Sequence, residues 1–263
     1  EMSPFLELTK ISEITRKLPQ AMQDKGFEIR ILMPRFGNIN ERRNRLHEVI
    51  RLSGMNIIID ENDNPLIIKV ASIPAARMQV YFLDNEEYFQ RKFVFRDNNN
   101  KFFEDNDERT IFFCKGALET VKKLGWAPDV VHCHGWMSSL VPVYLKTIYK
   151  DDPTFKSSKV VYSTYSDGFT ENLSPEFARK AIMSGMTSEH TEAFKDSSCT
   201  ALQKGAITYS DAVVIGRADV NEEVLNFVKN ASKPVLSYEA TSDFENYYNL
   251  YEEIASEESV SLA

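Results

Sequence analysis

Apolar residues along the chain recur at two spacings, and these spacings predict a series of strands and helices. Short apolar runs typical of β-strands lie at residues 29–33, 55–59, 66–71, 78–83, 129–133, 159–164, 212–215 and 234–237. Apolar residues recur every three or four positions over residues 11–22, 111–121, 137–149 and 220–228, and a tyrosine-rich helix is expected near the end. Because strands alternate with helices, the pattern predicts an α/β fold with a single, mostly parallel, doubly wound sheet.

Two local signals refine this picture. A polar stretch from Glu61 to Pro65 separates the apolar runs at 55–59 and 66–71, which predicts a β-hairpin inserted into the sheet. The dipeptide Ser174-Pro175 is typical of a helix start, with serine as the N-cap and proline as the first helical residue.

The segment from Trp126 to Lys146 holds the strongest candidate for a site. It is predicted to be a buried, central strand of the sheet, then a sharp polar turn and a helix. His132 and His134, two positions apart on one face, are expected at the carboxyl end of this strand. The carboxyl ends of parallel strands are where open α/β sheets bind ligands. The alternative is that His132 is a hydrogen-bonded core residue and that Trp136 only packs, and the residues alone do not decide between the two.

Composition sets limits on location. The chain of 263 residues contains no apolar run of membrane-spanning length, and its start lacks the basic and apolar pattern of a signal peptide. Its three cysteines are dispersed, which suits reduced thiols. These features predict a cytoplasmic protein that does not bind membranes.

Charge is unevenly placed along the chain. Seven acidic residues and no lysine or arginine lie between Glu239 and Ala263, a pattern typical of a solvated terminal helix or of disorder. Six arginines lie within residues 30–51, interleaved with glutamates. A salt-bridged helix face is the favoured interpretation of this region, an anion site is the alternative, and nucleic-acid binding is not predicted.

Motifs for common cofactor and metal chemistry are weak. No glycine lies in residues 1–25, so the first strand-to-helix turn has no glycine-rich phosphate loop. Only His47 and His190 accompany the two strand histidines, and neither is spaced as a further ligand, so no metal site and no cofactor are predicted. Cys133 is interpreted as a packed thiol rather than a nucleophile.

Several segments, in a fixed order, resemble the N-terminal half of the bacterial glycogen/starch synthase family. They are R30-I-L-M-P-R-F-G37, Y81-F-L-D-N-E-E-Y-F89, D105-N-D-E-R109, W126 to K146 and K204-G-A-I-T-Y-S-D211. Family members are retaining enzymes that transfer glucose from ADP-glucose to an α-1,4-glucan. The resemblance covers roughly residues 1–225. It implies half of a GT-B glycosyltransferase fold, with a synthase-like domain over residues 1–230 and a C-terminal extension over 231–263.

The chain departs from the family where the family binds nucleotide sugar. The family's first loop reads K-T-G-G-L, and its lysine, which meets phosphate, corresponds to Glu7 here. Its paired glycines correspond to Thr9 and Lys10, whose side chains hinder close approach of the backbone to phosphate. Lys10 is a candidate to replace the missing cation, but nothing replaces the glycines.

Three further departures follow the predicted strand ends. The family's aspartate after the second histidine corresponds to Gly135. Its T-I-H-N motif reads Y162-S-T-Y-S166, so the active-site histidine corresponds to Tyr165 and the asparagine to Ser166. No residue is therefore assigned as catalytic, and the candidates for lining a ligand cleft are Thr9, Lys10, His132, His134, Trp136, Tyr165 and Ser166.

The resemblance also implies a second domain and a first strand that have no counterpart in this sequence. Family members have a second Rossmann-like domain that supplies most donor contacts, and the residues after about 225 are too few for one. Glu1 falls where the family's first strand has just ended.

Three hypotheses remain open: a non-catalytic relative acting as a binding or complex subunit, an active half that borrows a donor domain, and a glucan-binding module. The first is favoured. A homo-oligomer or protein complex is expected, with an exposed cleft face carrying Trp136 and Tyr165, or the 30–51 arginine region, in the interface. A glucan or a nucleotide sugar is the candidate ligand.

Overall fold

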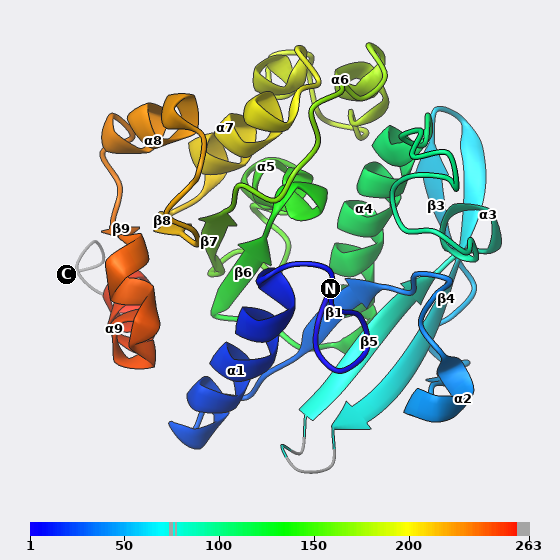
Figure 1. The fold of residues 1–263 in the computed structure, drawn as a ribbon, viewed down its shortest axis with the longest axis horizontal. Coiled ribbons are helices and arrows are strands. Elements are labelled where there is room, and N and C mark those ends of the chain that lie inside the picture. The colour runs from blue at the N-terminus through cyan, green and yellow to red at the C-terminus, as the bar shows by residue number, and fades with distance from the viewer. Residues whose placement is uncertain (74–75, 77, 257–263) are drawn as a thin grey trace. The chain divides into compact units, whose positions relative to one another are not determined.

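The computed structural model describes residues 1–73, 76 and 78–256. The chain divides into two compact units, Glu1–Leu124 and Gly125–Ala263, named here the N-terminal unit and the C-terminal unit (Figure 1). Each unit has its own sheet. The predicted division at residue 230 concerns the family resemblance and stays a prediction.

The N-terminal unit is built on a five-stranded mixed sheet in the order β1-β5-β4-β2, with β3 also pairing to β4. Its strands are β1 (Ile31–Pro34), β2 (His47–Glu48), β3 (Met55–Ile59), β4 (Asn62–Ile73) and β5 (Met78–Asp84). Its helices are α1 (Ile11–Asp24), α2 (Glu41–Asn44), α3 (Glu86–Phe89) and α4 (Asn106–Leu124). Only the pair β1 and β5 is parallel.

The predicted hairpin is confirmed as β3 and β4, which pair from Ile59 opposite Asn62. Asp60 and Glu61 form the two-residue turn, and both have positive φ values, 48° and 70°, as a type I′ turn requires. The turn is shorter than the sequence predicts, because Asn64 belongs to β4 and its side-chain amide donates to the Ile57 carbonyl at 3.1 Å. Polar residues of the expected loop therefore serve as strand.

The C-terminal unit is built on a four-stranded parallel sheet in the order β6-β7-β8-β9. Its strands are β6 (Val130–His134), β7 (Lys159–Thr164), β8 (Ala212–Ile215) and β9 (Val235–Leu236). Its α-helices are α5 (Leu140–Lys146), α6 (Phe177–Lys180), α7 (Cys199–Tyr209), α8 (Glu222–Lys229) and α9 (Phe244–Ser256), with the 3-10 helices η2 (Trp136–Ser138), η3 (Glu192–Phe194) and η4 (Tyr238–Ser242).

The structure refines the predicted sheet in two respects. The strands form two sheets instead of one, and the N-terminal sheet is mixed because the long strand β4 runs antiparallel to its neighbours. The second respect concerns β6, which carries the two histidines. We expected a central strand, but β6 is the end strand of its sheet, pairing only with β7 among the described residues.

Two predicted helices also differ. The helix expected over 137–149 is divided into η2 and α5, and α5 ends at Lys146. The predicted N-cap at Ser174 is wrong, because α6 begins at Phe177 with Glu176 as its N-cap. The Ser174 hydroxyl instead accepts from the Glu176 N–H at 3.2 Å, forming a turn before the helix.

No helix in the described part of the chain has the length and apolar character needed to cross a membrane. The final residues of the predicted acidic tail, 257–263, lie outside the described residues.

Candidate functional site

The two histidines of β6 form the centre of a polar cluster in the C-terminal unit. Their rings stack with centroids 4.1 Å apart and an interplanar angle of 25°. This confirms the prediction that His132 and His134 share one face, as alternate residues of a strand do. His134 is the last residue of β6, and His132 lies in the middle of the strand.

Three ring nitrogens of these histidines are within hydrogen-bond distance of hydroxyl groups. For His132, Nδ1 lies 2.6 Å from the Tyr251 hydroxyl of α9, and Nε2 lies 2.7 Å from the Ser163 hydroxyl of β7. For His134, Nδ1 lies 2.8 Å from the Tyr165 hydroxyl, just beyond the end of β7. A hydroxyl can both donate and accept, so each pair suits a neutral imidazole of either tautomer.

Burial decides the protonation state of both rings. It lowers the pKa of His132 well below its ordinary value and lowers the pKa of His134 to about 3. Burial also raises the pKa of the Tyr251 hydroxyl, which stays protonated. At neutral pH the cluster is therefore uncharged, which suits positioning of hydroxyl groups better than proton transfer near pH 7.

Tyr165 is held tightly at the end of β7. Only 4% of the residue is exposed, and its ring lies against the backbone of Gly216, where an added Cβ would come within 2.3 Å of a ring carbon. The Gly216 N–H donates to the Thr164 carbonyl at 2.9 Å and fixes this approach. Tyr165, which the sequence resemblance matched to the family's active-site histidine, is thus a phenol with little freedom to move.

Ser166 belongs to a separate, more open cluster. Its hydroxyl donates to a carboxylate oxygen of Asp219 at 2.9 Å, and Arg217 donates to both oxygens of the same carboxylate, at 2.8 and 3.0 Å. Hydrogen bonds from Arg217 and Ser166 hold the pKa of Asp219 well below its ordinary range. This cluster is charged and faces solvent. The histidine cluster, which includes the preceding residue Tyr165, is neutral and largely buried.

Trp136 does not lie on an exposed face. It is 7% exposed in η2, and its ring contacts Phe169 edge-on at 4.9 Å. Gly135, with φ at +74°, allows the sharp turn that directs the chain from β6 into η2. The expected exposed aromatic face with Trp136 and Tyr165 is therefore corrected, because both residues are buried.

The candidates Glu7, Thr9 and Lys10 lie in the N-terminal unit, in the loop that precedes α1. The side-chain carboxylate of Glu1 accepts from the Leu8 N–H at 2.7 Å and the Thr9 N–H at 2.8 Å, and also from the Thr9 hydroxyl. The Glu7 carboxylate accepts from the hydroxyl of Ser3. Lys10 is exposed and lies 3.9 Å from Glu13. This loop therefore presents its N–H groups to a carboxylate of its own chain.

A charged cluster that sequence reasoning missed follows β1 and β5. Asp84, fully buried at the end of β5, lies 2.9 Å from the Lys69 ammonium, and Lys69 lies 2.7 Å from Glu41. Arg35, just after β1, also pairs with Glu41. One Asp84 oxygen and the Arg35 Nε have no hydrogen-bond partner among the described residues. The only signal for this cluster in the sequence was Asp84, a carboxylate at the end of an apolar run.

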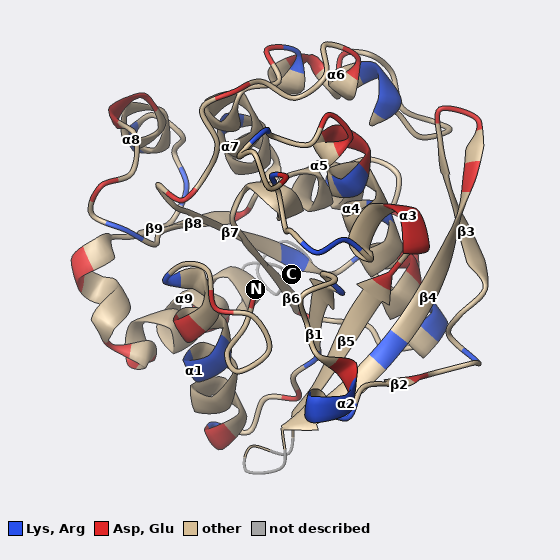
Figure 2. Ribbon diagram, turned by 45° about the vertical axis from the view of Figure 1, so that its right-hand side comes forward, with Lys and Arg blue, Asp and Glu red and all other residues tan. Residues whose placement is uncertain are grey.

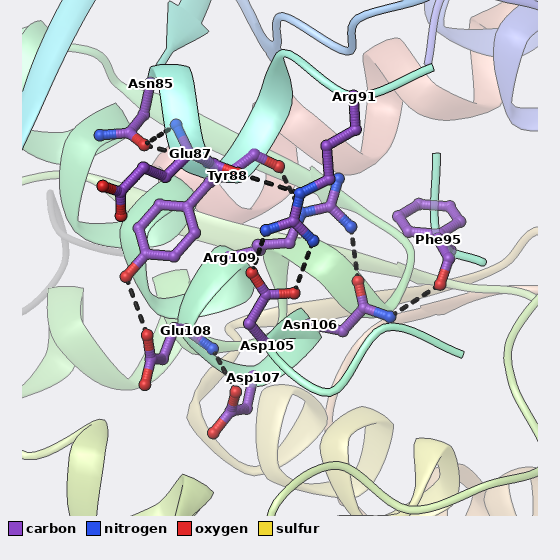
Figure 3. Close-up of polar contacts among 10 residues, drawn as sticks. All are labelled: Asn85, Glu87, Tyr88, Arg91, Phe95, Asp105, Asn106, Asp107, Glu108 and Arg109. Carbon is purple, nitrogen blue, oxygen red and sulfur yellow. Dashed lines mark hydrogen bonds and ion pairs between the residues drawn. The ribbon is translucent and has the colours of Figure 1, made fainter. Parts of the chain in front are cut away.

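A second missed feature is the buried guanidinium of Arg109 on α4 (Figure 3). It donates to the Tyr88 carbonyl at 2.8 Å and to the Asn106 side chain at 2.5 Å. Four rings surround it at 5.3–6.0 Å, those of Phe36, Phe89, Phe95 and Phe103. Burial lowers the pKa of Arg109 to about 9, so it is still a cation at neutral pH. Since Asp105 pairs with Arg91 instead, Arg109 fixes the loop after α3 without a carboxylate contact of its own.

Metal ligation has no support in the part of the chain that the structure describes. No group of three or more His, Cys, Asp and Glu side chains is arranged there to hold a metal ion. Cys133 is buried in β6.

Comparison with known proteins identifies the family. The model of the starch synthase catalytic domain matches residues 1–235. The glycogen synthase from Chlorobium luteolum is 43% identical to this chain, over 69% of this chain and 39% of its own length. The glycogen synthase from Chlorobaculum tepidum is 39% identical, over 70% of this chain and 40% of its own length. The chain thus spans about two-fifths of the length of these relatives.

A solved structure shows the same fold. The catalytic domain of starch synthase IV from Arabidopsis thaliana, bound to ADP and acarbose, superimposes with a TM-score of 0.71 at 18% identity. The match covers 90% of this chain and 49% of that one, so the two units correspond to one half of a GT-B glycosyltransferase fold. The chain belongs to the starch synthase catalytic domain family.

Proposed function

We propose that this chain is a synthase relative that does not transfer glucose itself and that acts as a binding or complex subunit. The observation that carries the proposal is the loop before α1, where the Glu1 carboxylate already accepts from the Leu8 and Thr9 N–H groups. An incoming phosphate would need those donors, and it would also meet the charge of Glu7. The loop is satisfied internally and repels anions.

The position of Tyr165 supports the same proposal. The family's histidine corresponds to a buried phenol whose hydroxyl is engaged by His134 at 2.8 Å. Loss of one group that stabilises transition-state charge typically lowers a rate by roughly 10²–10³. The loop lysine, the glycine pair and the histidine are all replaced here, so little transfer would remain.

Two other roles have weaker support. A glucan-binding module usually offers exposed aromatic rings for stacking on sugars, but Trp136 and Tyr165 are buried. An active half that borrows a donor domain would still need its own loop to accept phosphate. The Ser166, Arg217 and Asp219 cluster is the part of the C-terminal unit best suited to contact a polyol, because its polar groups are partly exposed.

The test is titration of the chain with ADP-glucose in a calorimeter. We expect no saturable heat, and a micromolar dissociation constant, about −8 kcal/mol, would contradict the proposal. Glu7→Lys combined with Glu1→Gln removes both negative charges and should make ADP binding measurable, whereas Glu104→Gln, an exposed carboxylate elsewhere, should not.

Catalysis is tested separately by incorporation of labelled glucose into glycogen. We expect none, with or without Glu7→Lys and Tyr165→His. Turnover by the wild-type chain that is lost on Tyr165→Phe or His134→Gln would show a working enzyme and would favour the active-half alternative.

A further inference from the structure

Four exposed arginines lie within residues 42–51 of the N-terminal unit, and together they are named here the arginine patch. They are Arg42, Arg43, Arg45 and Arg51, and none makes an ion pair with another described residue. The predicted salt-bridged helix face is not formed, because α2 has only four residues and its Glu41 points to Arg35 and Lys69 instead. The blue segment of α2 in Figure 2 marks part of this patch.

The same segment exposes a large apolar side chain. Ile50 is 84% exposed, the highest value among the large hydrophobic residues exposed in the described chain. The backbone that carries it is fixed, since the Val49 N–H donates to the Ile68 carbonyl of β4 at 2.8 Å. An isoleucine held in water among unpaired arginines is a typical composition for an interface with an acidic partner.

The C-terminal unit carries the complementary surface, named here the acidic surface. Four exposed carboxylates without an ion pair among the described residues lie along η4 and α9: Glu239, Asp243, Glu252 and Glu253. Residues 239–256 include no lysine or arginine, and Figure 2 shows red segments without blue along α9. Two exposed apolar residues adjoin them, Tyr238 at 43% and Val235 at 41%.

We propose that the arginine patch of one copy of this chain binds the acidic surface of a second copy. Each surface combines a surplus of unpaired charge with exposed apolar groups: four arginines against the single exposed Glu48 in one, and carboxylates without lysine or arginine in the other, so they match in charge and in character. The contact can form twice in a two-fold dimer, where each patch meets the acidic surface of the other copy, or repeat head to tail in a ring or a growing chain of copies. The inference names a partner for the proposed complex-subunit role, and its failure would leave the absence of donor binding untouched.

The charges make this association depend on salt. Exposed ion pairs are individually weak, and charges separated by more than the Debye length, about 8 Å at physiological ionic strength, are largely screened. We therefore expect the dissociation constant to rise at least tenfold between about 50 mM and 500 mM NaCl. Ile50 and Tyr238 supply an apolar contribution that salt does not weaken.

The experiment is sedimentation velocity of the full chain over a range of concentrations, at low and at high salt. The basic-reversed variant is Arg42→Glu, Arg43→Glu and Arg51→Glu, and the acidic-reversed variant is Asp243→Lys, Glu252→Lys and Glu253→Lys. Each alone should sediment as a monomer at low salt, and a mixture of the two should associate again. A control matched to the basic-reversed variant, Lys101→Glu, Lys122→Glu and Lys195→Glu, makes the same change in net charge at lysines that already have carboxylate neighbours.

Recovery in the mixture is the decisive result, since only opposed surfaces on different copies regain complementarity. A wild-type chain that stays monomeric at high concentration and low salt would overturn the proposal. Equal loss of association in the lysine control would also overturn it, because net charge alone would then account for the effect. Circular dichroism of each variant shows whether the fold is retained.

Discussion

The two units bury polar groups in opposite ways at the ends of their parallel strands. After β1 and β5 the buried groups form ion pairs: Asp84 is fully buried beside Lys69, with Arg35 and Glu41 nearby. After β6 and β7 the buried groups are neutral, two stacked histidines held by the hydroxyls of serine and tyrosine. The same architectural position thus supports two different electrostatic solutions.

The difference shows what burial requires of each kind of group. Burial raises the pKa of Glu41, but hydrogen bonds from Lys69 and Arg35 lower it further than burial raises it. Burial lowers the pKa of Lys69, but Glu41 and Asp84 more than compensate. The histidines have no carboxylate in hydrogen-bond contact among the described residues, so burial makes them neutral. In these two clusters a buried charge is retained where an opposite charge contacts it.

The largest expected effect comes from replacing Arg109. This buried cation differs from the charges above, because aromatic rings and neutral acceptors hold it. Arg109→Ala should lower the free energy of unfolding by about 4 kcal/mol, because it leaves a cavity and two unpaired acceptors. Arg109→Met should cost clearly less, since a thioether fills the space between the rings. Urea unfolding measures both, and a loss below 1 kcal/mol for the alanine variant would show that the guanidinium is not needed.

The next effect is the pH dependence of the free energy of unfolding, to which the polar clusters of the two units contribute in different pH ranges. The folded-state pKa values of His132 and His134 lie below the unfolded value of about 6.5, so their contribution is present above that pH and lost as pH falls below it. Each should reduce the free energy of unfolding by about 2 kcal/mol between pH 7 and pH 5. The pKa of Glu41 is lowered in the folded chain, so its contribution to the free energy of unfolding is lost only at more acidic pH, as the pH falls through its folded-state pKa.

Matched variants identify the source of this pH dependence. His134→Gln should reduce the slope of stability against pH between 7 and 5, and His47→Gln, at an exposed position on β2, should leave it unchanged. An unchanged slope in His132→Gln/His134→Gln would mean that burial does not lower the pKa values of these histidines in the folded chain relative to the unfolded chain.

The smallest effect tests a single hydrogen bond across the C-terminal unit. Tyr251→Phe removes the hydroxyl 2.6 Å from His132 Nδ1 and should cost about 1 kcal/mol, because a buried acceptor or donor is left unpaired. It should also shift the His132 resonances in an NMR spectrum, whereas Tyr209→Phe, whose hydroxyl bonds to the His190 carbonyl, should not. Unshifted resonances in the Tyr251 variant would show that the contact does not form in solution.

Much of the fold was predictable from local pattern. The strands 55–59, 159–164 and 212–215 have the predicted limits, because short apolar runs record burial on a sheet. The stacking of His132 and His134 follows from their spacing of two. Pairing was less predictable: no local signal reveals that β6 is an end strand or that β4 makes its sheet mixed, since strand neighbours are decided by tertiary contacts.

The site was predictable only in part. Tyr251 lies 119 residues from His132, and periodicity placed it on a helix without indicating its partner. Trp136 and Tyr165 looked suited to an exposed cleft, yet both are buried by residues, Phe169 and Gly216, that no motif marked. Distant contacts of this kind are recorded in no short stretch of sequence.

The close fit of Tyr165 against Gly216 has an evolutionary consequence. With its ring so near that any Cβ at position 216 would collide, the tyrosine tolerates only glycine there. A smaller ring at position 165 would leave room for a side chain at position 216, so a route of single substitutions reaches Tyr165 only through a glycine at 216. Once both were fixed, a larger residue at 216 was excluded until 165 changed, so replacements at these two positions are epistatic and their order is constrained.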